Sequence, residues 1–244
     1  MKNCFDFEKK INMDCVGFDG KTSPADVMAI FQQAVTEHTL EMKLDFKSIL
    51  EKYGAKWFIV SAHLEFFDMP AIDEDVNVRT WPLKSFAIKF PRAFVMTDKD
   101  GKKLAAAMTN WCIVDSKTNA LMRAKTLEFP FDEFISDVPT DKEQKFPAEN
   151  GAEFCYSRKI LMSDIDLNRH VNNVSYIRIA LDCFSTKEME NMDISALDIQ
   201  YKLQCYEGEV LDLYRQKTEN GYVIDGKRGD ETIFRLMITI KKEQ

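Results

Sequence analysis

Two stretches of the chain repeat one arrangement, an acidic residue followed by an amphipathic helix, and this duplication constrains the fold most strongly. The apolar residues of the two stripes are Val27, Ile30, Ala34 and Val35, and then Val174, Ile177, Leu181 and Phe184. Both stripes have the i, i+3, i+4, i+7 spacing of a helix that buries one face. A shift of 147 residues places Asp19 on Asp166 and Val27 on Val174. This repeat predicts two related halves.

Runs of residues typical of strands follow each predicted helix. In the first half they cover residues 58–66, 76–81, 86–96 and 104–114, and in the second half residues 197–203, 210–214, 222–225 and 233–240. Turn sequences separate some of them, at residues 98–101 and at Asn220-Gly221. Helices that precede consecutive strands favour an α+β fold over a parallel βαβ sheet. We therefore expect two long helices, each wrapped by a curved antiparallel sheet.

A polar stretch punctuated by proline marks the boundary between the halves. Pro130, Pro139 and Pro147 lie in it, and proline ends β-ladders and interrupts helices. We predict a first domain over residues 1–129, a linker over residues 130–150 and a second domain over residues 151–244. We expect the two domains to share one continuous sheet.

Charge and cysteine usage narrow the classes of function. Lys and Arg total 33 against 40 Asp and Glu, a net charge of −7, which argues against a general nucleic-acid binder. The six cysteines include no C-x-x-C pair, so we expect reduced thiols in a cytoplasmic protein. The first residues are acidic where a signal peptide is apolar, and no apolar run approaches the roughly 18 residues that span a bilayer. We expect no cofactor, because the chain has neither a glycine-rich phosphate loop nor metal-ligand spacing.

One polar segment just before the second helix differs from the scaffold around it. Asp166, Asn168 and His170 alternate there, so an extended backbone would place their side chains on one side. Asn172 or Asn173 would cap the helix, whose first-turn N–H groups are suited to stabilise an oxyanion. An imidazole with a pKa of about 6.5 moves protons near neutral pH. The segment is a candidate catalytic group; the alternative is a polar turn that only caps the helix.

The pattern Asp-x-Asn-x-His-Val-Asn-Asn-x-x-Tyr resembles the acyl-acyl-carrier-protein thioesterases of plants and bacteria. The resemblance covers most of the chain and includes residues 57–60, 75–82 and 100–115. It implies a double (tandem) hot-dog fold and hydrolysis of an acyl thioester on acyl carrier protein, which releases a free fatty acid. It also implies catalytic roles for Asp166, Asn168 and His170. The family's later Glu-Cys pair falls on Gln204 and Cys205, so glutamine replaces the glutamate here.

Two mechanisms are open for such a site. In one, Cys205 attacks the thioester as a thiolate, His170 takes its proton and Asn168 orients the imidazole. In the other, His170 or Asp166 activates water and Cys205 only lines the pocket. We favour activated water, because cysteine is commonly buried and Gln204 lacks a carboxylate.

The repeat also predicts a division of labour. Under the shift of 147, Lys21 pairs with Asn168 and Ser23 with His170, so the first half lacks the catalytic side chains. We expect the first half to form the acyl pocket and the second half to catalyse. Of the other histidines, His38 is expected at the edge of the core and His63 on the exposed side of its strand.

An acidic carrier protein needs a local basic surface on this acidic chain. We expect that surface near the catalytic half, built from Arg158, Lys159, Arg169, Arg178 and Lys202. Two other functions are alternatives: a hot-dog thioesterase that acts on acyl-CoA, and a non-catalytic acyl-binding protein with a degenerate site. The sequence does not fix the acyl chain length, and a homodimer is left open.

Overall fold

The computed structural model describes residues 2–140 and 145–241. Residues 1, 141–144 and 242–244, which belong to the ends of the predicted domains and to the predicted linker, lie outside the described residues. The elements of the first half are β1 (Phe5–Lys10), α1 (Pro24–Glu41), α2 (Phe46–Tyr53), β2 (Ala55–Phe66), β3 (Asp75–Pro82), β4 (Phe90–Asp98) and β5 (Lys103–Asp115). Those of the second half are β6 (Glu153–Lys159), α3 (Asn173–Leu181), α4 (Thr186–Glu190), β7 (Ile194–Tyr201), β8 (Val210–Thr218), β9 (Gly221–Arg228) and β10 (Glu231–Ile240).

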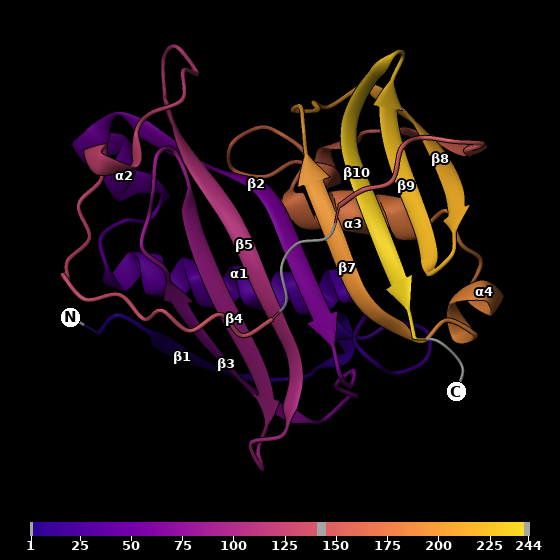
Figure 1. Cartoon of the computed structure of the whole chain (residues 1–244), viewed down its shortest axis with the longest axis horizontal. Helices are drawn as coiled ribbons and strands as arrows, with labels where there is room; N and C mark the ends of the chain where they lie inside the picture. Colours follow the sequence, from indigo (N-terminus) through magenta and orange to yellow (C-terminus); the bar gives the residue numbers. More distant parts are fainter. Residues whose placement is uncertain (1, 141–144, 242–244) are drawn as a thin grey trace.

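All these strands form one sheet, and its order shows the duplication directly. The order is β1-β3-β4-β5-β2-β7-β10-β9-β8-β6, and the pairings are antiparallel. From the centre outward, β2-β5-β4-β3-β1 corresponds to β7-β10-β9-β8-β6. The two helices α1 and α3 cross the strands on the same face of the sheet (Figure 1). This is the α+β, double hot-dog fold that the sequence predicted, with a continuous sheet. The second helix is shorter than expected, because α3 has nine residues and ends before Phe184.

One hydrophobic core joins the two halves. Val27 and Phe31 of α1 belong to the same cluster of buried side chains as Ile177 and Ile179 of α3. The two helices also contact each other directly. Removal of this apolar surface from water stabilises both halves together. The fold therefore places the two helices close enough to enclose a site between them.

The helix starts correct the alignment of the halves by two residues. Ser23 caps α1, since its Oγ accepts a hydrogen bond from the Asp26 N–H at 3.2 Å. Asn172 caps α3, since its Oδ1 accepts one from the Val174 N–H at 2.8 Å. The two caps are 149 residues apart, so the predicted shift of 147 is wrong. Several adjacent positions of a well-buried helix are apolar, so the stripe alone does not fix the offset, whereas the caps do.

The predicted strand over residues 86–96 begins later than expected. Residues 86–89 form a tight turn in which the Phe86 N–H donates to the Lys89 carbonyl at 3.0 Å and the Lys89 N–H donates back at 2.8 Å. Ala87 has a φ of 51° in this turn, which a strand does not permit. The strand β4 therefore starts at Phe90.

His63 is buried, with 2% of its surface exposed, so the prediction of an exposed side chain is wrong. It does lie on the face of β2 away from the helices, but that face is covered. Arg235, whose side chain is on the same face, donates to the Pro147 carbonyl at 3.2 Å. The described residues of the connection between β5 and β6 thus cross the outer face of the sheet (Figure 1). Among the described positions of residues 130–150, none forms a helix or strand.

Candidate active site

A cavity of about 670 Å³ lies between the two halves and brings the predicted site residues together. Its walls come from α1, from the first part of β2, from the loop before α3 and from the end of β7. The predicted residues among its lining are Asp166, Asn168, His170 and Gln204. The apolar part of the lining includes Val35, Leu44, Trp57, Phe90, Trp111 and Phe129. An apolar cavity with a few convergent polar groups is typical of a small-molecule site.

The loop that carries the polar residues is a tight turn and not the extended segment considered from the sequence. Asp166 Oδ1 accepts a hydrogen bond from the Asn168 N–H at 2.8 Å, and the Asp166 N–H donates to the His170 carbonyl at 2.9 Å. Arg169 takes a left-handed conformation, with a φ of 63°. An aspartate that bonds its own backbone two residues on favours such a turn. The turn, rather than strand alternation, brings the three side chains to the cavity.

The His170 imidazole is held by aromatic neighbours. Its ring centroid lies 5.7 Å from that of Phe58 and 5.2 Å from that of Tyr206, which meets it edge-on. Burial lowers the pKa of His170, the nearby charge of Asp166 opposes this, and the charge of Lys56 lowers the pKa further. The net shift is downward, so the imidazole is neutral at neutral pH and can accept a proton.

Asn168 offers an acceptor to whatever occupies the cavity. Its Oδ1 is buried and has no hydrogen-bond partner among the described residues. A buried polar atom without a partner is costly, and such atoms in native proteins commonly mark a bound water or ligand. Asn168 and His170 together can therefore hold a polar molecule at the cavity wall.

Cys205 lies behind the wall and is not among the residues that line the cavity. It is fully buried, and its carbonyl accepts a hydrogen bond from the Val171 N–H at 3.0 Å. Burial, together with the hydrogen bond and the charge of Glu209, raises the pKa of the thiol to about 12. A thiolate is the nucleophilic form, so this environment disfavours attack by Cys205.

The structure adds two residues that the sequence analysis missed. Phe58 and Tyr206 flank the His170 ring, and the Tyr206 hydroxyl donates to Gln204 Oε1 at 2.8 Å. Tyr206 follows the last strand-like residues of its run and belongs to no motif or periodic pattern, so no sequence signal identified it. Phe58 belongs to an alternating strand run and to the family-like residues 57–60, and neither pattern indicates a contact with His170.

A second cavity, of about 1070 Å³, lies at the equivalent place between the halves, where the loop before α1 faces α3 and the residues that follow it. The Thr22 N–H donates to the Pro70 carbonyl at 2.9 Å, as the Val171 N–H does to Cys205. Offset by 149, Lys21 therefore corresponds to His170, and the earlier pairing of His170 with Ser23 is wrong. Met69, which precedes Pro70, stands where Gln204 stands in the second half. The second cavity therefore lacks the imidazole at this position.

The described residues give no sign of a metal centre or a membrane span. Within residues 2–140 and 145–241, no group of three or more His, Cys, Asp or Glu side chains is placed to hold a metal ion. In the same residues no helix is both long enough and apolar enough to cross a bilayer.

Comparisons with known proteins agree with the fold. Two solved structures superpose over nearly the whole chain. One is an acyl-ACP thioesterase from Bacteroides thetaiotaomicron, with a TM-score of 0.87, 21% identity and 98% of both chains covered. The other is a 12:0-ACP thioesterase from Umbellularia californica, with a TM-score of 0.86 and 19% identity, covering 100% of this chain and 99% of that one. At these identities the likeness concerns the fold.

Sequence relatives point to the same family. The chain is 24% identical over 200 residues to oleoyl-acyl carrier protein thioesterase 2, chloroplastic, of Arabidopsis thaliana, which covers 75% of this chain and 54% of the relative. It is 28% identical over 211 residues to a dodecanoyl-[acyl-carrier-protein] hydrolase, chloroplastic, of Cinnamomum camphora, a match that covers 80% of this chain and 55% of the relative. The chain thus spans about half the length of these curated relatives. The acyl-ACP thioesterase N-terminal domain matches residues 2–126, and the acyl-ACP thioesterase C-terminal domain matches residues 150–244. The chain belongs to the acyl-ACP thioesterase family.

Proposed function

We propose that the protein hydrolyses the thioester of an acyl chain on acyl carrier protein and releases a free fatty acid. The observation that carries this proposal is the neutral His170 imidazole at the wall of an apolar cavity, beside the buried free acceptor of Asn168. The cavity volume of about 670 Å³ falls in the range of sites for chain-like or drug-sized molecules.

The proposed reaction uses water as the nucleophile. Water donates one hydrogen bond to the His170 imidazole and the other to Asn168 Oδ1. His170 takes the proton as the water oxygen attacks the carbonyl carbon, and it returns that proton to the sulfur when the C–S bond breaks. The products are a carboxylic acid and the carrier thiol. Asp166 stabilises the transient imidazolium by its charge and holds the turn through the Asn168 N–H.

The covalent route through Cys205 has weaker support. Its thiol is fully buried and has a pKa raised to about 12. It also does not line the cavity, so its sulfur is not presented to a thioester bound there, and its raised pKa leaves little of the nucleophilic thiolate. We therefore assign Cys205 a structural role behind the cavity wall, and Gln204 a place in the wall itself.

The division of labour between the halves remains our proposal. The catalytic loop belongs to the proposed domain at residues 151–244, while α1 and β2 of the proposed domain at residues 1–129 supply much of the cavity wall. Residues 130–150 would act as the linker. The absence of an imidazole at Lys21 in the second cavity supports a single catalytic copy.

The carrier-docking surface also remains a proposal, and we restrict it to fewer residues than the sequence suggested. Arg158 and Arg178 line the second cavity and are engaged by Asp164 at 3.0 Å and Asp26 at 3.2 Å. Arg169 and Lys202 lie instead beside the catalytic residues, on the loop and at the cavity wall. We propose that an acidic carrier protein docks on the side of these two residues.

Cytoplasmic location and a homodimer also remain proposals. None of the described cysteines forms a disulfide, which is consistent with a reducing compartment. They are Cys4, Cys15, Cys112, Cys155, Cys183 and Cys205. Sedimentation of the purified protein would test the dimer.

Release of free fatty acid from acyl carrier protein and from acyl-CoA, measured side by side over a range of chain lengths, tests the function. We expect turnover with the carrier substrate and a loss of at least about 100-fold in His170→Ala. Lys21→Ala is the matched control at the equivalent position and should retain turnover. Preference for acyl-CoA would favour the first alternative, and a bound acyl chain without turnover would favour the acyl-binding protein.

A further inference from the structure

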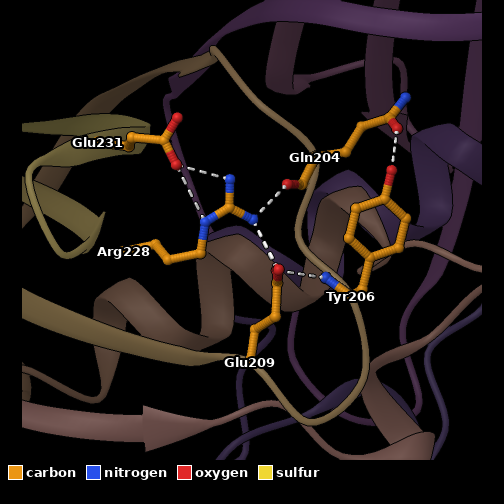
Figure 2. A network of polar contacts seen from close by, with 5 residues as sticks. All are labelled: Gln204, Tyr206, Glu209, Arg228 and Glu231. Carbon is orange, nitrogen blue, oxygen red and sulfur yellow. Dashed lines mark hydrogen bonds and ion pairs between the residues drawn. The ribbon is translucent and has the colours of Figure 1, made fainter.

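Gln204 is held by a network that determines which end of its amide reaches the substrate. The Tyr206 hydroxyl donates to Gln204 Oε1 at 2.8 Å, and Figure 2 shows the amide nitrogen directed away from Tyr206. Gln204 lines the cavity, so the group left for a substrate is the Nε2 donor. A carboxylate at this position would present only acceptors.

The backbone around these two side chains is fixed at both ends. The Tyr206 N–H donates to Glu209 at 2.9 Å, and Glu209 receives two hydrogen bonds from Arg228 Nη1, at 2.8 and 2.9 Å. Arg228 Nη1 also reaches the Gln204 carbonyl at 3.5 Å, while the rest of its guanidinium is held by Glu231 (Figure 2). The charge-assisted bonds of this network make the placement of Tyr206 rigid.

Tyr206 touches both sides of the reaction centre. Its hydroxyl binds Gln204, and its ring meets the His170 ring edge-on at 5.2 Å. One side chain thus sets the orientation of the cavity-lining amide and restricts the general base. Preorganised donors stabilise a developing oxyanion because they need not reorient during reaction.

We propose that Tyr206 is a positioning residue that turns the Gln204 amide so that its Nε2–H donates to the thioester carbonyl oxygen. This inference rests on the proposed hydrolysis. It assigns to Gln204 the opposite hydrogen-bonding role to that of a carboxylate: the residue acts as a donor to the oxyanion and neither accepts nor carries the catalytic proton.

Two substitutions test the two parts of the assignment in the full-length protein. Tyr206→Phe keeps the ring against His170 and removes only the hydroxyl, so kcat should fall about 3- to 10-fold with KM nearly unchanged. Gln204→Glu should lower kcat about 10-fold or more at neutral pH and move the pH optimum toward acid, where the introduced carboxyl is protonated and donates. Tyr214→Phe, on β8 and outside the cavity wall, is the control and should match the wild type.

A measurement without substrate supports the kinetic one. The side-chain amide signals of Gln204, assigned in nuclear magnetic resonance spectra through their loss in Gln204→Ala, should shift in Tyr206→Phe and stay in place in Tyr214→Phe. If His170→Ala is inactive but Tyr206→Phe keeps the wild-type kcat, this inference is overturned while the proposed hydrolysis stands. A Gln204→Glu variant as active as the wild type at neutral pH would have the same consequence. Absence of hydrolysis by the wild type would instead overturn the proposed function, and the catalytic role of Gln204 with it.

Discussion

The three histidines of the chain differ in pKa because each meets a different neighbourhood. His38 is buried against Phe5 of the edge strand β1, and burial and the charge of Arg92 lower its pKa to about 4. Burial also lowers the pKa of His170, which faces the cavity. At His63 burial is outweighed by Asp198 and Glu65, and the pKa rises. Of the three, His170 alone combines a free base with access to a substrate.

Substitution of Cys205 separates the two mechanisms. Because the thiol has a raised pKa and lies outside the cavity wall, Cys205→Ala should keep kcat/KM within about 3-fold of the wild type. Cys15→Ala is the matched control, since Cys15 is also buried and also lies outside the cavity wall. A loss of 100-fold confined to Cys205→Ala, or an acyl-enzyme trapped and seen by mass spectrometry, would restore the covalent route.

The site residues were predictable to the extent that they are close in sequence. Asp166, Asn168 and His170 lie within one short loop, so a single polar segment indicated all three. Tyr206 and His63 owe their roles to partners across the fold: Tyr206 meets His170, and His63 meets Asp198 from another strand. Neither contact can be predicted from periodicity, because alternation along a strand indicates on which face of the sheet a side chain lies but not which residues cover that face.

At the scale of elements, the duplication was predictable and its offset was not. Apolar spacing located both helices, but only the hydrogen bonds of Ser23 and Asn172 show that they begin 149 residues apart. In β2 the register with β5 shifts between Ile59 and Ser61, which leaves Val60 exposed. Such a bulge changes which face follows it, so alternation read from the sequence alone could not place it.

The paired caps allow a controlled test of the catalytic loop. Asn172→Ala and Ser23→Ala each remove one helix cap and should each lower the free energy of unfolding by about 1 kcal/mol. Only Asn172→Ala should also lower kcat, several-fold, because its helix follows the loop of His170. Urea unfolding and steady-state kinetics on both variants measure this. An equal fall in kcat in Ser23→Ala would show that the loss reflects stability and not the loop.

At the scale of the molecule, the sequence predicted a continuous sheet but not which two strands pair at its centre. β2 pairs with β7 from Ser61 opposite Gln200 to Glu65 opposite Ala196. We call this β2–β7 pairing the seam. Several strands in both halves have an apolar alternation compatible with this central place, and packing on both faces of the sheet sets the register between distant strands. Across this seam His63 Nδ1 and Asp198 Oδ1 are 2.8 Å apart, both buried. This contact therefore links the two halves on the outer face.

This seam should make the stability of the molecule depend on pH in a way that can be isolated. Burial alone would lower the pKa of His63, but the hydrogen bonds and charges of Asp198 and Glu65 raise it above the unfolded value of about 6.5. Protonated His63 therefore stabilises the fold fully below pH 6.5, and this contribution is lost as the pH rises through the raised pKa. The difference in free energy of unfolding between wild type and His63→Gln, from urea titrations between pH 5 and 9, should be largest at low pH.

His38 supplies the opposite control within the same protein. Because its folded pKa is lowered to about 4, the unfolded chain takes up the proton first, and stability falls by about 1 to 2 kcal/mol between pH 6.5 and pH 5. The difference between wild type and His38→Gln should therefore shrink as the pH is lowered, while that for His63→Gln grows. A His63→Gln difference that is flat, or that grows with rising pH, would show that the seam does not hold a charged imidazole and that the halves are joined by backbone pairing and apolar packing alone.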